Sequence, residues 1–228
     1  MTWIKICGIT SIEDAGKAAS LGVDALGFIF APSPRRVGPD AAQGIIKVLP
    51  RTLLKVGVFV NEDREEVQRL AEYCGINALQ FHGEEMPGYC RNFFRPVFKA
   101  LRIKDLEDLE DMEDYRDISI LLDTYSPVHA GGTGLPFPRE IALEAKKRRN
   151  FILSGGLTPG NVGEAIQTVR PWGVDVCSGV EAIPGKKDAL KMAEFVKEVR
   201  KIDGDTRSKG AFWSTGRNVR SRDADGSS

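Results

Sequence analysis

The sequence is poor in the residues that build metal and disulfide sites. Its 228 residues include four cysteines and two histidines, and no two cysteines have CxxC spacing. The histidines, His82 and His129, lie far apart in the chain. This spacing argues against a structural zinc site, and a chain of this length does not need a disulfide framework to fold. We therefore expect reduced thiols and no bound metal.

Net charge and long apolar segments are also lacking. Lysine plus arginine total 32, aspartate plus glutamate total 32, and the formal net charge is zero. A neutral chain has no general attraction for nucleic acid or anionic membranes, so an anionic ligand needs a local site. No apolar run approaches the roughly 18 residues of a membrane span. The first ten residues do not read as a signal peptide, because Lys5 interrupts an already short apolar run. We expect a cytoplasmic protein that binds a small molecule, without nucleic-acid or membrane partners.

Short apolar segments alternate with amphipathic helical stretches along most of the chain. Eight segments are candidate strands: residues 3–7, 25–30, 55–60, 78–81, 97–101, 119–123, 151–153 and 174–177. Such alternation favours parallel strands joined by helices, and eight units close naturally into a barrel. Six or seven units would favour an open, doubly wound sheet instead. The sequence thus predicts an α/β fold, a single-domain (β/α)8 TIM barrel with short loops.

Helix signals and a change of composition set the boundaries of these units. Ser11 has the chemistry of a helix cap, and Thr158-Pro159 places proline in the first turn of another helix. The barrel is predicted over residues 1–202. Residues 203–228 are rich in glycine, serine, arginine and aspartate without periodicity, which predicts a disordered tail, with a basic arm as the alternative.

The ends of two predicted strands carry candidate catalytic groups. In parallel barrels, active-site residues lie at the carboxyl ends of the strands. Because side chains alternate along a strand, Lys5 and Cys7 are expected to face the barrel interior, with Cys7 at the mouth. On spacing alone, Cys7 could equally be a small buried hydrophobic residue. Asp123 directly follows three apolar residues at the end of the sixth strand, which indicates a site-facing acid, the alternative being a turn or helix-cap aspartate.

Glycine loops follow the seventh and eighth strands. They contain Gly155-Gly156 and Ser178-Gly179, and the corresponding loops of such barrels frequently bind phosphate through backbone N–H groups. Residues 131–134, with the sequence GGTG, follow the sixth strand and form either another loop at the mouth or a plain linker. After the second strand, Arg35 and Arg36 could bind a carboxylate or form a solvated surface pair.

Taken in order, several strings resemble the phosphoribosylanthranilate isomerase family, from residue 3 to about residue 200. They are KICGIT at 5–10, ALGFIFAPSPRRV at 25–37, VGVFVNE at 56–62, LQFHGEE at 79–85, LLDT at 121–124, GGTG at 131–134, LSGGLTPGNV at 153–162 and VDVCSGVEAIPGKKD at 174–188. The resemblance implies an Amadori rearrangement in tryptophan biosynthesis. N-(5-phosphoribosyl)anthranilate would become 1-(2-carboxyphenylamino)-1-deoxyribulose 5-phosphate.

The same resemblance assigns roles to individual residues. Cys7 matches the general base and Asp123 the general acid, while Arg36 matches the residue that meets the anthranilate carboxylate. His82 matches a histidine near the site, and Asp175 a polar residue facing the mouth. The phosphate would lie on Gly155, Gly156, Ser178 and Gly179. No cofactor is implied, because the iminium of the substrate serves as the electron sink. The family implies a monomer or a homodimer.

Three points qualify this assignment. A free thiol has a pKa near ~8.5 and is mostly protonated at neutral pH, so we expect the barrel mouth to lower the pKa of Cys7. Pro138 stands where the family usually has an acid after the GGTG string, which puts substrate contacts from that loop in doubt.

The alternative functions are another ribulose-phosphate barrel, such as an aminoimidazole-ribonucleotide isomerase or indole-glycerol-phosphate synthase, and a catalytically silent barrel acting as a binding or partner module. The cysteine of KICGIT argues against the first two enzymes.

Overall fold

Eight parallel strands close into a barrel in the computed structural model, which describes residues 1–124 and 138–204. Each strand pairs with the next in the chain, and β8 pairs with β1 to complete the ring. The strands are β1 (Trp3–Ile6), β2 (Ala25–Ile29), β3 (Leu54–Phe59), β4 (Ala78–Phe81), β5 (Val97–Ile103), β6 (Ser119–Thr124), β7 (Ile152–Leu153) and β8 (Gly173–Val176). The predicted (β/α)8 barrel is confirmed, with strand ends within about two residues of those expected.

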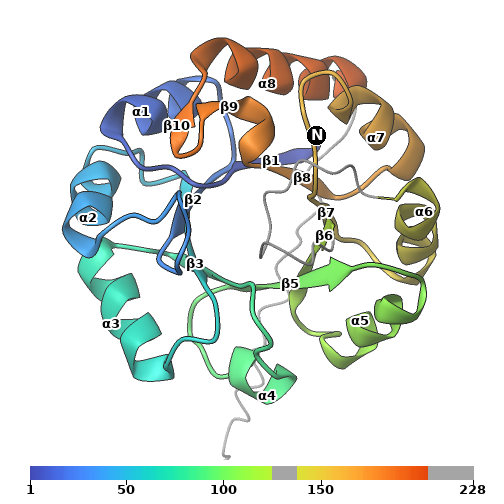
Figure 1. Cartoon of the computed structure of the whole chain (residues 1–228), viewed down its shortest axis with the longest axis horizontal. Helices are drawn as coiled ribbons and strands as arrows, with labels where there is room; N and C mark the ends of the chain where they lie inside the picture. The colour runs from blue at the N-terminus through green and yellow to red at the C-terminus, as the bar shows by residue number, and fades with distance from the viewer. Residues whose placement is uncertain (125–137, 205–228) are drawn as a thin grey trace, which may run out of the picture.

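Helices surround the barrel and connect its strands (Figure 1). They are α1 (Ile12–Ser20), α2 (Pro39–Lys47), α3 (Arg64–Cys74), α4 (Pro87–Cys90), α5 (Asp111–Asp114), α6 (Arg139–Arg148), α7 (Val162–Val169) and α8 (Ala189–Asp203). Two 3-10 turns, η1 (Glu107–Glu110) and η2 (Ser178–Val180), and a hairpin of β9 (Glu181–Ile183) and β10 (Lys186–Lys187) complete the fold. Within the described ranges, no helix combines the length and the apolar character needed to cross a membrane.

The two helix starts predicted from the sequence have different outcomes. Ser11 caps α1 as expected, since its hydroxyl accepts a hydrogen bond from the N–H of Asp14 at 3.1 Å. The predicted start of α7 at Thr158 is wrong, because the helix begins at Val162. Asn161 accepts a hydrogen bond from the N–H of Thr158 at 2.8 Å and donates one to the carbonyl of Gly156 at 2.9 Å. These bonds shape residues 158–161 as a turn attached to the glycine loop.

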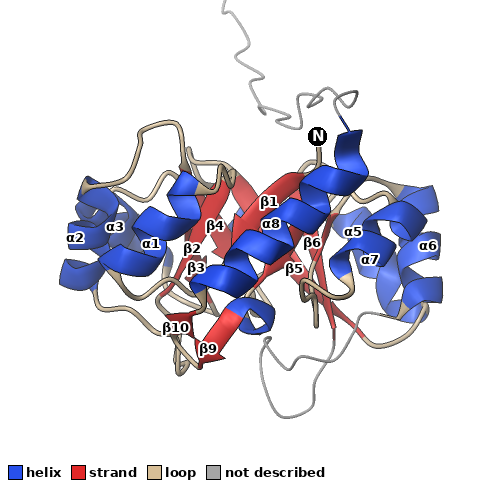
Figure 2. Cartoon of the chain, turned by 90° about the horizontal axis from the view of Figure 1, so that it is seen from above, coloured by secondary structure: helices blue, strands red, loops and turns tan. Residues whose placement is uncertain are grey.

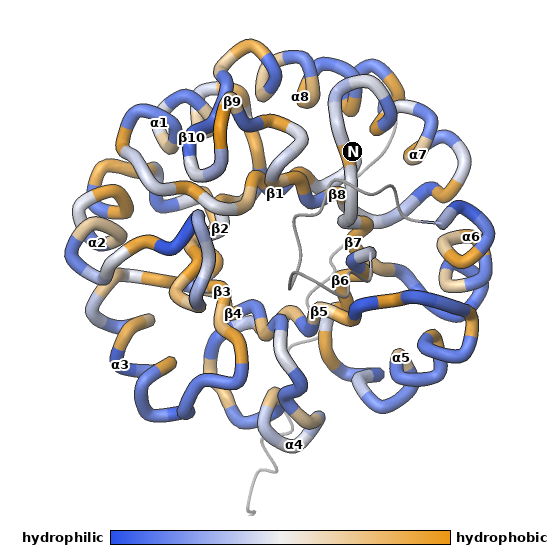
Figure 3. Tube along the Cα trace, in the orientation of Figure 1, coloured by the Kyte–Doolittle hydropathy of each residue, from blue (hydrophilic) through white to orange (hydrophobic). Residues whose placement is uncertain are grey.

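Side-chain alternation divides the hydrophobic residues into two cores. Residues such as Ile4 and Ile6 point outward and belong to the large cluster packed beneath the helices. Hydrophobic and hydrophilic stretches alternate around that helical ring (Figure 3). A smaller cluster fills the barrel interior and comprises Trp3, Ala25, Val56, Ala78, Phe98, Ala100, Leu121 and Ile152. Inside the barrel, polar side chains follow these apolar ones toward the carboxyl ends of the strands.

The two ends of the barrel differ in chemistry. The amino-terminal end is closed by Trp3, whose ring lies 5.7 Å from that of Phe98 and 5.3 Å from that of Trp172. Figure 2 shows the β9–β10 hairpin at the opposite end from the N-terminus. The Asp203 carboxylate accepts hydrogen bonds from the N–H and hydroxyl of Thr2 at 2.7 and 2.5 Å. Asp203 is the last residue of α8, one residue beyond the predicted boundary. Residues 205–228, the rest of the predicted tail, lie outside the described residues.

Candidate active site

Cys7 directly follows β1, at the end of the strand where the alternation predicts it. Its side chain is buried, and a Cβ added to Gly27 on the neighbouring strand would come within 2.6 Å of the Cys7 sulfur. Glycine at position 27 therefore makes the room that this thiol occupies. Two residues earlier on the same face of the strand, Lys5 Nζ forms a buried ion pair with Asp175 Oδ1 at 2.9 Å. Asp175 is thus inside the barrel as expected, with an ammonium partner that the sequence did not reveal.

The expected lowering of the Cys7 pKa is wrong. A side-chain hydrogen bond to Cys177 and burial raise the pKa of Cys7 well above its ordinary value, although the Lys5 ammonium opposes this. The lowered pKa belongs to Cys177, at about 7, because its sulfur accepts that hydrogen bond and lies near Lys187 and Arg35. Within this pair of thiols, the negative charge is therefore favoured on Cys177.

Asp123 on β6 faces His82, which follows β4, across the intervening strand β5. The carboxylate is buried, and its Oδ2 lies 3.2 Å from Nε2 of His82. The other ring nitrogen, Nδ1, lies 3.2 Å from Nε2 of the buried Gln80. Further along this loop, Glu85 accepts hydrogen bonds from the N–H groups of Asn61 and Gly83. The sequence predicted His82 near the site, and the structure places it against the candidate acid.

The loops after β7 and β8 pack directly on each other. Gly155 has φ +88°, and a Cβ there would lie 2.1 Å from Thr124 Oγ1. A Cβ on Gly179 would lie 1.9 Å from the carbonyl oxygen of Leu157. Only glycine permits these approaches. The structure thus brings the loops of Gly155 and Gly179 together, and Ser178 and Gly179 begin the short turn η2.

The paired arginines after β2 take different positions. Arg35 donates hydrogen bonds to both carboxylate oxygens of Glu181, through Nε at 2.9 Å and Nη2 at 2.9 Å. Arg36 is exposed, and none of the ion pairs among the described residues involves it. Its role in binding a ligand carboxylate stays a prediction.

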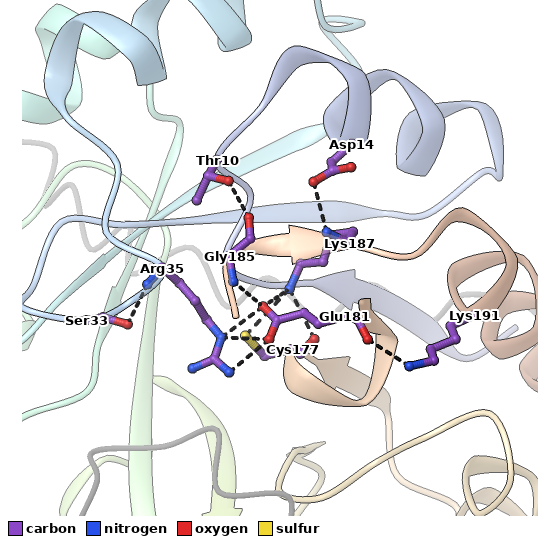
Figure 4. A network of polar contacts seen from close by, with 9 residues as sticks. All are labelled: Thr10, Asp14, Ser33, Arg35, Cys177, Glu181, Gly185, Lys187 and Lys191. Carbon is purple, nitrogen blue, oxygen red and sulfur yellow. Dashed lines mark hydrogen bonds and ion pairs between the residues drawn. The ribbon is translucent and has the colours of Figure 1, made fainter. Parts of the chain in front are cut away.

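Sequence reasoning missed a buried charged cluster beside the mouth (Figure 4). Glu181 pairs with Lys187 at 2.9 Å as well as with Arg35, and Lys187 Nζ also lies 3.7 Å from the Cys177 sulfur. Asp14 accepts a hydrogen bond from the N–H of Lys187 at 3.0 Å. The only sequence signal was the mixture of charges in VEAIPGKKD, which does not identify the partners.

Two further predictions concern the segment after β6 and metal binding. The GGTG string at 131–134 and His129 lie outside the described residues. Pro138 lies just before α6 with φ −61° and ψ 120°. Among residues 1–124 and 138–204, no group of three or more histidine, cysteine or carboxylate side chains is placed to hold a metal ion.

Comparison with known proteins decides the family. The family model described as N-(5'phosphoribosyl)anthranilate (PRA) isomerase matches residues 4–198. The chain belongs to this family. It is 50% identical over 205 residues to N-(5'-phosphoribosyl)anthranilate isomerase from Desulforudis audaxviator, covering 88% of this chain and 98% of the relative.

Solved structures agree with the family assignment. Phosphoribosyl anthranilate isomerase from Thermotoga maritima superposes with a TM-score of 0.82 and 44% identity, covering 87% of this chain and 98% of that one. A second isomerase structure, in complex with reduced 1-(o-carboxyphenylamino)-1-deoxyribulose 5-phosphate, gives a TM-score of 0.79 at 43% identity with the same coverage. That complex holds a phosphorylated ligand in a related barrel.

Proposed function

We propose that Cys7 and Asp123 are the base and the acid with which this isomerase rearranges N-(5-phosphoribosyl)anthranilate in tryptophan biosynthesis. The observation that carries the proposal is their placement. Cys7 follows β1 and Asp123 lies near the end of β6, and both side chains are buried toward the same mouth of one closed barrel. A thiol and a carboxyl on opposite sides of one site can transfer protons at different positions of one substrate.

The first chemical step is opening of the ribose ring. Asp123 in its protonated form would donate to the ring oxygen, and the bond between that oxygen and C1′ breaks to give an iminium. His82 Nε2 lies 3.2 Å from the Asp123 carboxylate and would position this side chain when substrate is bound. Gln80 on β4 contacts the opposite side of the imidazole and limits its rotation.

The second step is removal of the C2′ proton. The Cys7 thiolate would accept this proton, and the electrons of the C–H bond move toward the iminium nitrogen to form an enolamine. Protonation at C1′, with loss of the proton of the C2′ hydroxyl, then gives the aminoketose. The raised pKa of Cys7 means that the resting side chain is a thiol. The Lys5 ammonium beside it and the positive charge of the bound iminium both favour its ionised form.

Two further contacts orient the substrate. Backbone N–H groups of Gly155, Gly156, Ser178 and Gly179 would bind the phosphate, and the close packing of their loops supports one shared cradle. Exposed Arg36 would bind the anthranilate carboxylate through bidentate hydrogen bonds. The phosphorylated small molecule is the only partner that the proposal requires, and the protein is taken to act in the cytoplasm as a monomer or a homodimer.

The isomerisation is followed by loss of substrate fluorescence. Purified wild-type protein should consume N-(5-phosphoribosyl)anthranilate, whereas Asp123→Asn should lower kcat by about 10²- to 10⁴-fold, the contribution typical of a general acid. A folded wild-type protein without activity would instead support the catalytically silent barrel. Full activity in Asp123→Asn would remove the proposed acid.

A further inference from the structure

Two thiols lie side by side at the mouth of the barrel. Cys7 directly follows β1 and Cys177 directly follows β8, and the residues before them, Ile6 and Val176, are Cα partners in the parallel pairing. The N–H of Cys7 donates a hydrogen bond to the carbonyl of Val176 at 2.8 Å, so the pairing continues to the cysteines. Neighbouring strands lie about 4.8 Å apart, within the ~4.4–6.8 Å range of Cα separations that a disulfide spans. The interaction between the two thiols shifts the pKa of Cys7 up and that of Cys177 down.

Cations surround the Cys177 sulfur. Lys187 Nζ lies 3.7 Å from it and 3.1 Å from the Cys177 carbonyl oxygen (Figure 4). Arg35 is a near neighbour as well, because a Cβ on Gly8 would meet both the Cys177 sulfur at 3.0 Å and Arg35 Cδ at 3.1 Å. Glu181 fixes both cations through its carboxylate. Positive charge beside a thiol favours the thiolate, which is the nucleophilic form.

The other two cysteines provide an internal contrast. Cys74 on α3 and Cys90 on α4 are buried beneath the helical layer, and burial raises the pKa of Cys90 to about 11. Cys177 is partly exposed. Reactivity with an oxidant follows thiolate character and exposure, and both select Cys177.

We propose that Cys177 and Cys7 form a reversible disulfide on exposure to a hydroperoxide, an oxidative modification site built into the mouth of the barrel. That this bond stops the isomerisation rests on the proposed function of Cys7 as the base. The formation of the bond itself does not depend on that role.

The chemistry balances with hydrogen peroxide as the oxidant. The Cys177 thiolate attacks one peroxide oxygen, an S–O bond forms, the O–O bond breaks, and the departing hydroxide takes a proton to become water. Cys7 then loses its proton and attacks the Cys177 sulfur. The S–S bond forms, the S–O bond breaks, and the second hydroxide leaves as water with that proton. The two thiols lose two electrons, which the peroxide gains, and a dithiol such as dithiothreitol reverses the result.

The test is a peptide map of the full chain under non-reducing conditions, before and after treatment with hydrogen peroxide. The matched variants are Cys177→Ser and Cys74→Ser. We expect wild type and Cys74→Ser to yield a linked pair of peptides containing Cys7 and Cys177, lighter by two hydrogens than the separate peptides, and Cys177→Ser to yield none. The isomerase rate of the linked protein should fall about a hundredfold or more, as for loss of a general base, and recover with dithiothreitol.

The outcomes separate the inference from the proposed function. Wild-type protein in which Cys7 and Cys177 stay unlinked while peroxide is consumed or oxidises other residues would overturn the disulfide. An equal, dithiothreitol-reversible loss of activity in Cys177→Ser would overturn the claim that this bond is what stops the isomerisation. A linked pair that retains full activity would support the disulfide and count instead against Cys7 as the base. Because the wild-type map decides the linkage, the test does not depend on how well any variant folds.

Discussion

The imidazole of His82 lies 3.2 Å from the Asp123 carboxylate, measured from Nε2 to Oδ2, and Gln80 contacts its other ring nitrogen. The Nε2 geometry falls short of an aligned hydrogen bond. Such contacts are often long or misaligned before substrate binds and tighten in the reacting complex. We therefore expect His82 to act as a positioning residue for Asp123.

Removal of the His82 side chain should make Asp123 a less effective acid while leaving its carboxyl group in place. We expect His82→Ala to lower kcat about tenfold, with KM changed little, because a misplaced catalytic group mainly affects the transition state. In an Asp123→Asn background, the same substitution should cost almost nothing further, since coupled residues are not additive. A double-mutant cycle on the fluorescence assay measures this. Equal tenfold losses in both backgrounds would show that His82 acts independently of Asp123.

The two neighbouring arginines should give opposite phenotypes. Arg36→Met should raise KM by about tenfold or more with little effect on stability, because an exposed guanidinium that binds a carboxylate contributes about 1.5–3 kcal/mol. Arg35→Met removes a partner of buried Glu181 and should lower the free energy of unfolding by about 2 kcal/mol, with Lys187 limiting the loss. Steady-state kinetics and urea denaturation separate the two effects. A kcat defect without a KM change in Arg36→Met would argue against its role in binding.

The packing of the two glycine loops predicts that the effect of a glycine-to-alanine substitution on stability depends strongly on its position. Gly179→Ala should lower the free energy of unfolding by about 1–3 kcal/mol, because its Cβ would lie 1.9 Å from the Leu157 carbonyl oxygen. The matched control is Gly160→Ala, where the nearest contact, Thr158 Oγ1, would be an ordinary 3.7 Å away. Denaturant titrations should place the control within about 0.5 kcal/mol of wild type. Equal effects at the two positions would contradict the described approach of the loops.

Acid should remove the contribution of Glu181 to stability. Burial raises the pKa of this carboxyl, but hydrogen bonds and ion pairs with Arg35 and Lys187 outweigh burial and leave the pKa below 4.5. A lowered folded-state pKa gives stability that is present above the unfolded pKa and is lost as pH falls through the folded one. The difference in unfolding free energy between wild type and Glu181→Gln should therefore be full near pH 7 and shrink below about pH 4.5. A difference that stays constant over this range would exclude the ionised carboxylate as its source.

Much of the fold could be predicted because barrel strands carry a repeating local signal. The period-two alternation of Ile4 and Ile6 with Lys5 and Cys7 identifies which side chains enter the barrel, and the structure agrees. Strand ends then indicate which residues reach the mouth. The start of α7 was misplaced because proline in a first turn is a local preference, whereas the Asn161 hydrogen bonds that shape this segment depend on the folded loop.

The electrostatics of the site could not be read from the sequence. The pKa of Cys7 depends on Cys177, which is 170 positions away and becomes a neighbour only when β8 closes against β1. Similarly, no local sequence feature distinguishes Arg35 from Arg36. Glu181 in the β9 hairpin forms hydrogen bonds with Arg35 only after the chain has folded. Interactions between distant segments decide which of the candidate groups are charged.

The rate of C2′ proton removal in a Cys7 variant tests the account most directly. Single-turnover isomerisation should be measured with C2′-protonated and C2′-deuterated substrate in wild type, Cys7→Ala and the buried-cysteine control Cys74→Ala. The account predicts a rate about 10²- to 10⁴-fold lower in Cys7→Ala, with proton removal limiting and substrate still bound, and an unchanged rate in the control. A Cys7→Ala protein that isomerises both substrates at the wild-type rates would contradict it.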